Sequence, residues 1–146
     1  MKIYLASSWR NPQQPEAVAA LRAAGHEVYD FRNPEPGNGG FSWRSMSEPW
    51  ELKDGARFRD HVLRHPVAQA GFALDMNALK AAHATVLVLP CGRSAHLELG
   101  YATGAGQLTI VLLDEPVSEP ELMYLMNSRI CTSVGEVVDA LVTRSV

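Results

Sequence analysis

Thr85-Val86-Leu87-Val88-Leu89, followed by Pro90-Cys91-Gly92-Arg93, predicts a buried strand that ends in a tight turn. A helix is expected from about Ser94 to Gly104, and a second apolar strand from Leu108 to Leu113. Strands this continuously apolar are usually buried on both faces, which is typical of a parallel sheet covered by helices. In such sheets ligands bind at the carboxyl ends of the strands, so a site is expected at this turn.

The rest of the chain alternates strands and helices in the same way. Turn residues separate the segments, and Ser133 with Glu136 forms a capping box at the start of the last helix. The expected strands are Lys2 to Ala6, His26 to Phe31 and Ile130 to Cys131, and the expected helices run from Pro15 to Ala24, from Val67 to Ala82 and onward from Ser133. The pattern predicts one doubly wound α/β domain over residues 1–146, with a five-stranded parallel sheet in the order 2-1-3-4-5 and helices on both faces.

Composition excludes several classes of protein. A net charge of -3 with 20% charged residues gives no surface for nucleic acid or membrane, and no apolar run approaches the length of a membrane span. The first residues lack the long apolar region of a secretion signal, and two cysteines without CxxC spacing make no disulfide framework. A cytoplasmic protein is expected.

Two carboxylates are candidates for chemistry. Ser94 is expected to be the N-cap of its helix, which places Glu98 one turn inside, with its side chain leaning toward the crevice. Asp75 lies on the apolar stripe formed by Phe72 and Leu79, where a carboxylate is costly unless it is paired or used. On position alone, Glu98 is either catalytic or a solvated acid near the helix dipole, and Asp75 is either a second catalytic carboxylate or a residue at a wet edge.

Other segments carry weaker signals. Residues 42–66, with Trp43 and Trp50, are expected to be helical in part and to form either a base-stacking wall or an ordinary packed helix. His61 and His65 have the i, i+4 spacing of metal ligands but no third ligand cluster, so no metal is expected. Cys91 has no histidine placed by sequence to activate it and is interpreted as structural. No nucleotide-cofactor motif is present, and no cofactor is expected.

Four stretches together resemble one enzyme family. They are Ile3-Tyr4-Leu5-Ala6-Ser7-Ser8-Trp9, Asp75 with Asn77, Glu98-Leu99-Gly100-Tyr101-Ala102, and Pro120-Glu121-Leu122-Met123. The sequence resembles the nucleoside 2-deoxyribosyltransferases and the related deoxynucleotide N-glycosidases. The resemblance implies that Glu98 is the nucleophile, that Tyr4 orients it, and that Asp75 contacts the base and the 2-deoxyribose region. It also places Ser7 and Trp9 at the substrate, and implies that the segment from Glu121 to Met123 reaches into a neighbouring subunit's site.

Two departures from the family leave the substrate open. Gly92 lies where the transferases tend to have an Asp, and Glu121 lies where they have an Asn. With Arg93 and Ser94, Gly92 forms a neutral-to-basic turn that either binds a 5′-phosphate or is a plain helix cap beside a solvated guanidinium. The sugar then passes to another base or to water, and a non-catalytic nucleotide-binding or signalling module is the alternative to an enzyme.

The segment from Leu122 to Met126 is more apolar than a short surface loop normally is. Such patches are usually interfaces, so the segment predicts a homo-oligomer, with active sites shared between subunits as the resemblance implies.

Overall fold

A computed structural model describes residues 1–46 and 54–143. Its five strands form one sheet in the order β2-β1-β3-β4-β5, and every neighbouring pair is parallel, as the sequence predicts. Within the described residues, the elements are β1 (Lys2–Ala6), α1 (Gln14–Ala23), β2 (Glu27–Asp30), η1 (Trp43–Ser45), α2 (Gly55–Arg57), η2 (Phe58–Val62), α3 (Pro66–Ala81), β3 (Ala84–Val88), α4 (Arg93–Gly104), β4 (Leu108–Leu112), η3 (Leu122–Met126), β5 (Arg129–Cys131) and α5 (Val134–Val142).

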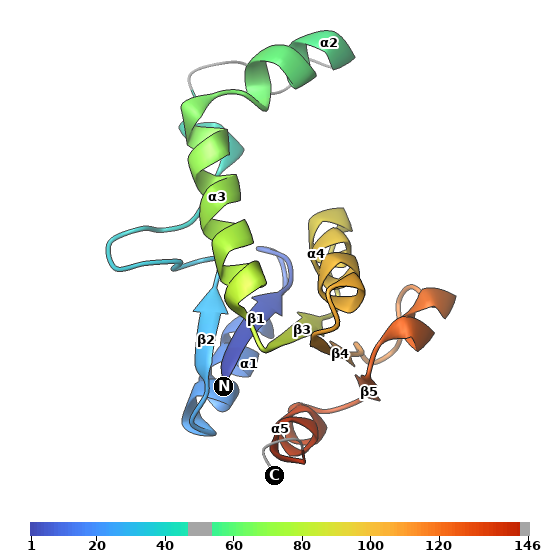
Figure 1. Ribbon diagram of the computed structural model, residues 1–146. Helices are drawn as coiled ribbons and strands as arrows, with labels where there is room; N and C mark the ends of the chain where they lie inside the picture. The colour runs from blue at the N-terminus through green and yellow to red at the C-terminus, as the bar shows by residue number, and fades with distance from the viewer. Residues whose placement is uncertain (47–53, 144–146) are drawn as a thin grey trace.

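The helices cover the sheet in two layers (Figure 1). On one face, Ile3 and Leu5 of β1 pack with α1 and α5 in an apolar cluster. On the other face, Tyr4 and Ala6 of the same strand pack with α3, α4 and Tyr124 of η3. The alternation of side chains along β1 therefore sends its apolar residues to one layer and its tyrosine to the other.

The long helix α3 has a different buried face from the one expected. Leu79 is buried, but Phe72, predicted to lie on the same buried stripe, is 65% exposed. Figure 1 shows that the first part of α3 extends past the ends of the strands. The helical period was predicted correctly, whereas the length over which the sheet covers the helix was not.

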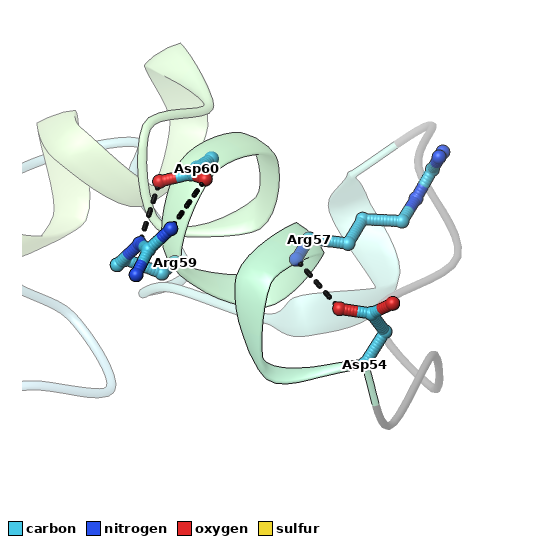
Figure 2. A network of polar contacts seen from close by, with 4 residues as sticks. All are labelled: Asp54, Arg57, Arg59 and Asp60. Carbon is cyan, nitrogen blue, oxygen red and sulfur yellow. Dashed lines mark hydrogen bonds and ion pairs between the residues drawn. The ribbon is translucent and has the colours of Figure 1, made fainter.

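The segment before α3 is helical in part, as expected, with Trp50 outside the described residues. The side chain of Asp54 caps α2 by accepting from the backbone N–H of Arg57 at 3.1 Å, and Arg59 pairs with Asp60 through its Nε at 2.7 Å (Figure 2). Both pairs lie at the surface, where an ion pair contributes little stability.

The two histidines of this segment are not brought together as ligands. The ring of His65 accepts from the backbone N–H of Val67 at 3.1 Å and so caps α3, while His61 is exposed. Among residues 1–46 and 54–143, no group of three His, Cys, Asp or Glu side chains is placed to hold a metal ion. In the same ranges no helix is both long and apolar enough to cross a membrane.

Candidate active site

A cleft of about 830 Å³ lies against residues that follow β1, β2 and β3. This is the edge of a parallel sheet at which ligands bind in doubly wound folds. Two carboxylates, three arginines and four aromatic side chains line it. The full lining is Ser7, Ser8, Trp9, Arg10, Phe31, Gly39, Phe41, Ser42, Trp43, Arg44, Asp75, Gly92, Arg93, Ser94, Ala95 and Glu98.

Most of the residues singled out in the sequence meet in this cleft. They are Ser7, Trp9, Asp75, Gly92, Arg93, Ser94 and Glu98. Tyr4 lies buried in the adjoining core. Glu121 and Met123 do not line the cleft of their own chain; the Glu121 carboxylate accepts from the backbone N–H of Met123 at 2.8 Å and caps η3. The functional roles of all these residues remain predictions.

Glu98 is held in a desolvated setting by Tyr4. Burial and the nearby negative charge of Asp75 raise the pKa of Glu98 to about 7, and a hydrogen bond from Tyr4 opposes that rise. Burial also raises the pKa of Tyr4 above its ordinary value, so the phenol stays protonated and donates to the carboxylate. At neutral pH, Glu98 is therefore partly ionised and poorly hydrated, as suits a carboxylate nucleophile.

Asp75 has a tyrosine partner of its own, which the sequence analysis missed. The Tyr29 hydroxyl donates to Oδ1 of Asp75 at 2.8 Å. Burial raises the pKa of Asp75, and the bond from Tyr29 lowers it. The register of the sheet could have indicated Tyr29, because Tyr4 on β1 and Tyr29 on β2 are register partners. Their rings stack with a distance of 5.3 Å between centroids.

The two carboxyl groups influence each other electrostatically. The charge of Asp75 contributes to the raised pKa of Glu98, so ionisation of both at once is unfavourable. A pair of this kind holds one proton more readily than none or two. Such a pair can hold one ionised and one protonated carboxyl group in the same cleft.

The start of α4 differs from the prediction. The N-cap is Gly92 and not Ser94, and no side chain caps this helix end. Because α4 begins at Arg93, Glu98 is its sixth residue, not its fourth. The preference of Ser for the N-cap position suggested the later start, but the extended backbone ends at Gly92. The first backbone N–H groups of α4 thus have no side-chain partner, and Gly92, Arg93 and Ser94 line the cleft.

Three guanidinium groups border the same cleft, from Arg10, Arg44 and Arg93. Within the described parts of the chain, none of these three side chains makes a hydrogen bond or an ion pair. Two carboxyl groups line the same cleft, and the pKa of one of them, Glu98, is raised to about 7. The rim is therefore electrostatically favourable for an anion.

Four aromatic side chains form part of the cleft wall. The rings of Trp9 and Phe31 pack edge to face with their centroids 5.5 Å apart. Those of Phe41 and Trp43 do the same with their centroids 5.0 Å apart. Gly40 has a φ of 86°, and a Cβ there would lie 2.4 Å from the carbonyl oxygen of Phe31 and 2.8 Å from the Trp9 ring. Only glycine lets the loop approach Trp9 so closely. Trp43, expected either to stack on a base or to pack as an ordinary core residue, lies in the cleft wall.

Behind the turn, His96 joins α4 to η3. Its Nδ1 lies 2.8 Å from the Gly92 carbonyl oxygen and its Nε2 lies 2.8 Å from the Tyr124 hydroxyl. The same ring is 3.7 Å from Sγ of Cys91, so a histidine does adjoin this thiol, contrary to the sequence analysis. Burial raises the pKa of Cys91 to about 12, which keeps the thiol protonated and agrees with a structural residue.

No protein-family model and no curated protein matches the sequence. Several solved structures match, and among them are three that match over nearly the whole chain. A 2-deoxyribosyltransferase of Bacillus psychrosaccharolyticus has 19% identity and a TM-score of 0.67, and the match covers 95% of this chain and 91% of that one. A conserved protein of Enterococcus faecalis V583 has 14% identity and a TM-score of 0.64, covering 99% and 98%.

The third structure is a CMP N-glycosidase of Clostridium botulinum, with 17% identity, a TM-score of 0.53 and coverage of 98% of each chain. At these identities the likeness concerns the fold, while the site of this chain has to be argued from its own residues. The protein thus has the α/β fold of a 2-deoxyribosyltransferase and of a CMP N-glycosidase, which bears out at the level of architecture the resemblance predicted from the sequence.

Proposed function

We propose that the protein cleaves the N-glycosidic bond of a 2-deoxyribonucleoside or its 5′-monophosphate through a covalent intermediate on Glu98. The observation that carries the proposal is the pair formed by buried Tyr4 and half-buried Glu98, beside Asp75 in the cleft. A desolvated carboxylate next to a second carboxyl group is the apparatus of retaining glycosidic cleavage. The fold shared with two enzymes that act on nucleosides or nucleotides supports the same reaction class.

The reactive form is the one in which the single proton of the pair lies on Asp75 and Glu98 is ionised. An oxygen of Glu98 attacks the anomeric carbon, and the bond to the base nitrogen breaks with its electron pair going to the base. Asp75, directly or through water, donates a proton to the base, which leaves as a neutral molecule. Water or a second base then attacks the anomeric carbon, its proton passes to the Asp75 carboxylate, and the Glu98 carboxylate is released with net retention. The chain's own groups suffice for each step.

A panel of substrates tests this proposal. Purified protein is incubated with the common deoxynucleosides, their 5′-monophosphates and CMP, with and without a second free base, and the released base is quantified by chromatography. Base release that disappears in Glu98→Gln supports the proposal, and exchange with the added base separates transfer from hydrolysis. Binding without any release would support the alternative of a non-catalytic nucleotide-binding module.

The start of α4 supports a 5′-monophosphate as the substrate. Ser94 does not cap the helix, so the simplest structural use of its hydroxyl is absent. Arg93 and the uncapped N–H groups border the same cleft, and Arg10 adds a further positive charge at its rim. A dianionic phosphate complements these donors and the helix dipole.

The phosphate proposal predicts a preference for a deoxynucleoside monophosphate over its nucleoside. Arg93→Ala should reduce that preference by about 1.5–3 kcal/mol, the usual range for a hydrogen bond to a charged group. Arg64→Ala, at an exposed arginine that does not line the cleft, is the matched control. Equal kcat/KM for the two substrates, or an unchanged ratio in Arg93→Ala, would assign the site to unphosphorylated nucleosides.

We also propose a homo-oligomer built on η3. Tyr124 is buried and anchors this turn to His96, whereas Leu122 and Leu125 are each 75% exposed. Met123, Met126 and the nearby α4 residue Leu97 are exposed as well. Association with a second copy would cover these side chains and bring Glu121 and Met123 toward a neighbouring cleft. A monomer by light scattering at micromolar concentration that is fully active would refute this proposal.

A further inference from the structure

Tyr29 and Tyr4 form a matched pair beneath the two carboxylates. They are register partners on adjacent parallel strands, and their rings stack with an interplanar angle of 16°. Each hydroxyl serves one carboxylate: Tyr4 donates to Glu98 on α4, and Tyr29 donates to Asp75 on α3. The stacking fixes the spacing of the two phenols, and hence the positions at which they hold the two acids.

The contact from Tyr29 distinguishes the two oxygens of Asp75. Within residues 1–46 and 54–143, the Tyr29 hydroxyl at 2.8 Å from Oδ1 is the one hydrogen-bond partner of this carboxyl group. Burial raises the pKa of Tyr29 well above its ordinary range, so the phenol keeps its proton and Oδ1 remains an acceptor. A proton on Asp75 therefore belongs on Oδ2, which Tyr29 does not engage.

We propose that Tyr29 is a positioning residue that holds Oδ1 of Asp75 and thereby makes Oδ2 the oxygen that delivers the proton to the departing base. This inference rests on the proposed function. It assigns Tyr29 to leaving-group departure, while Tyr4 serves the nucleophile. The proton moves from Oδ2 to the base nitrogen as the glycosidic bond breaks, and the resulting carboxylate keeps its bond from Tyr29.

Several titratable groups surround the pair formed by Tyr29 and Asp75. Asp75, Glu98 and Glu35 act on Tyr29 electrostatically, and Tyr29 acts on Asp75. Removing the Tyr29 hydroxyl takes away a bond that favours the ionised form of Asp75. The pKa of Asp75 should therefore rise in Tyr29→Phe, while the bond from Tyr4 to Glu98 is kept.

The kinetic test compares two leaving groups. An ordinary purine deoxynucleotide needs a proton on the departing base, whereas its 7-methylated form carries a positive charge and leaves as a neutral base without one. Tyr29→Phe should lower kcat for the ordinary substrate on the order of 10- to 100-fold and leave kcat for the methylated substrate nearly unchanged. Tyr101→Phe, at an exposed tyrosine of α4 outside the cleft, is the matched control. Equal losses on both substrates, or no loss on either, would overturn the inference.

A second measurement does not depend on turnover. Carbon-13 NMR titration of the Asp and Glu carboxyl groups should show a higher Asp75 pKa in Tyr29→Phe than in the wild type, and no such change in Tyr101→Phe. An unchanged Asp75 titration would overturn the inference. If no substrate is cleaved while Asp75 titrates as expected, the proposed function fails and the hold of Tyr29 on Asp75 stands.

Discussion

The two faces of the sheet use the same strands for different purposes. Against α1 and α5, alternate residues of β1, β3 and β4 form an apolar cluster that includes Leu21 and Leu141. Against α3 and α4, the intervening residues include Tyr4, and Glu98 and Asp75 lie within its reach. The comparison shows that one face is built for stability, while the other accepts desolvated acids, which cost stability and make chemistry possible.

The largest expected effect is on the second face. Glu98→Gln keeps the shape of the side chain and its contact with Tyr4 but removes the nucleophile. Turnover should fall by roughly 10⁴-fold or more, as for other enzymes that lose their nucleophile, with substrate binding retained. Base release and calorimetric binding measure the two quantities separately. Activity near the wild-type level in Glu98→Gln would refute the claim that the second face carries the chemistry.

A core substitution on the first face should lower stability and leave turnover nearly unchanged. Leu21 is 1% exposed in the cluster between α1 and the sheet. Leu21→Ala should lower the free energy of unfolding by about 2–5 kcal/mol, because it removes buried methyl groups and leaves a cavity. The kcat per folded molecule should stay within about twofold at temperatures where the variant is folded. A large loss of kcat without loss of stability would show that the two faces are not separate.

The pH profile should report Glu98. Because its pKa is about 7, kcat/KM should fall about tenfold per pH unit above that value, as the pair loses the one proton that Asp75 delivers to the base. In Tyr4→Phe the ionised form of Glu98 loses its hydrogen bond, which raises the pKa of Glu98. The fall in kcat/KM should therefore move to higher pH. A flat profile between about pH 5 and 8 in the wild type is incompatible with this account.

The smallest expected effect is a gain in stability. The folded-state pKa of Glu98, about 7, exceeds its ordinary value of 4.5, so the folded state binds the proton more tightly than the unfolded state. The wild-type free energy of unfolding should therefore decline as pH rises from 4.5 to about 7. Glu98→Gln avoids this loss and should be more stable than the wild type at pH 8, on the order of 1–3 kcal/mol. Denaturant titrations at pH 5 and pH 8 would contradict this if the two proteins differed equally at both.

The strand order followed from the sequence because the apolar runs leave few choices. The strand from Lys2 to Ala6 has its predicted bounds, and the run beginning near Thr85 lies at the centre of the sheet. Ser133 and Glu136 cap α5, with Glu136 accepting from the backbone N–H of Thr132 at 2.7 Å. These features are determined by residues that are close together in the sequence, so the sequence alone predicts them.

Features that depend on distant partners were less accessible. Tyr29 is 46 residues from Asp75 in the sequence, and only the register of β1 and β2 places it beside Tyr4. Phe72 is exposed although it belongs to the predicted apolar stripe, and the distance by which α3 extends past the strands is not encoded in that stripe. At the start of α4, Gly92 and Ser94 could each be the N-cap, and the extended backbone at Gly92 selects the earlier one.

The central claim is that the sugar becomes bonded to Glu98, and mass spectrometry tests it most directly. The protein is mixed with a substrate that it cleaves, quenched in acid within the first turnovers, digested with pepsin and mapped. The account predicts one peptide heavier by the mass of the glycosyl group, with the modification on Glu98 and absent from Glu98→Gln. Base release without any adduct, together with continued release by Glu98→Gln, would contradict the account.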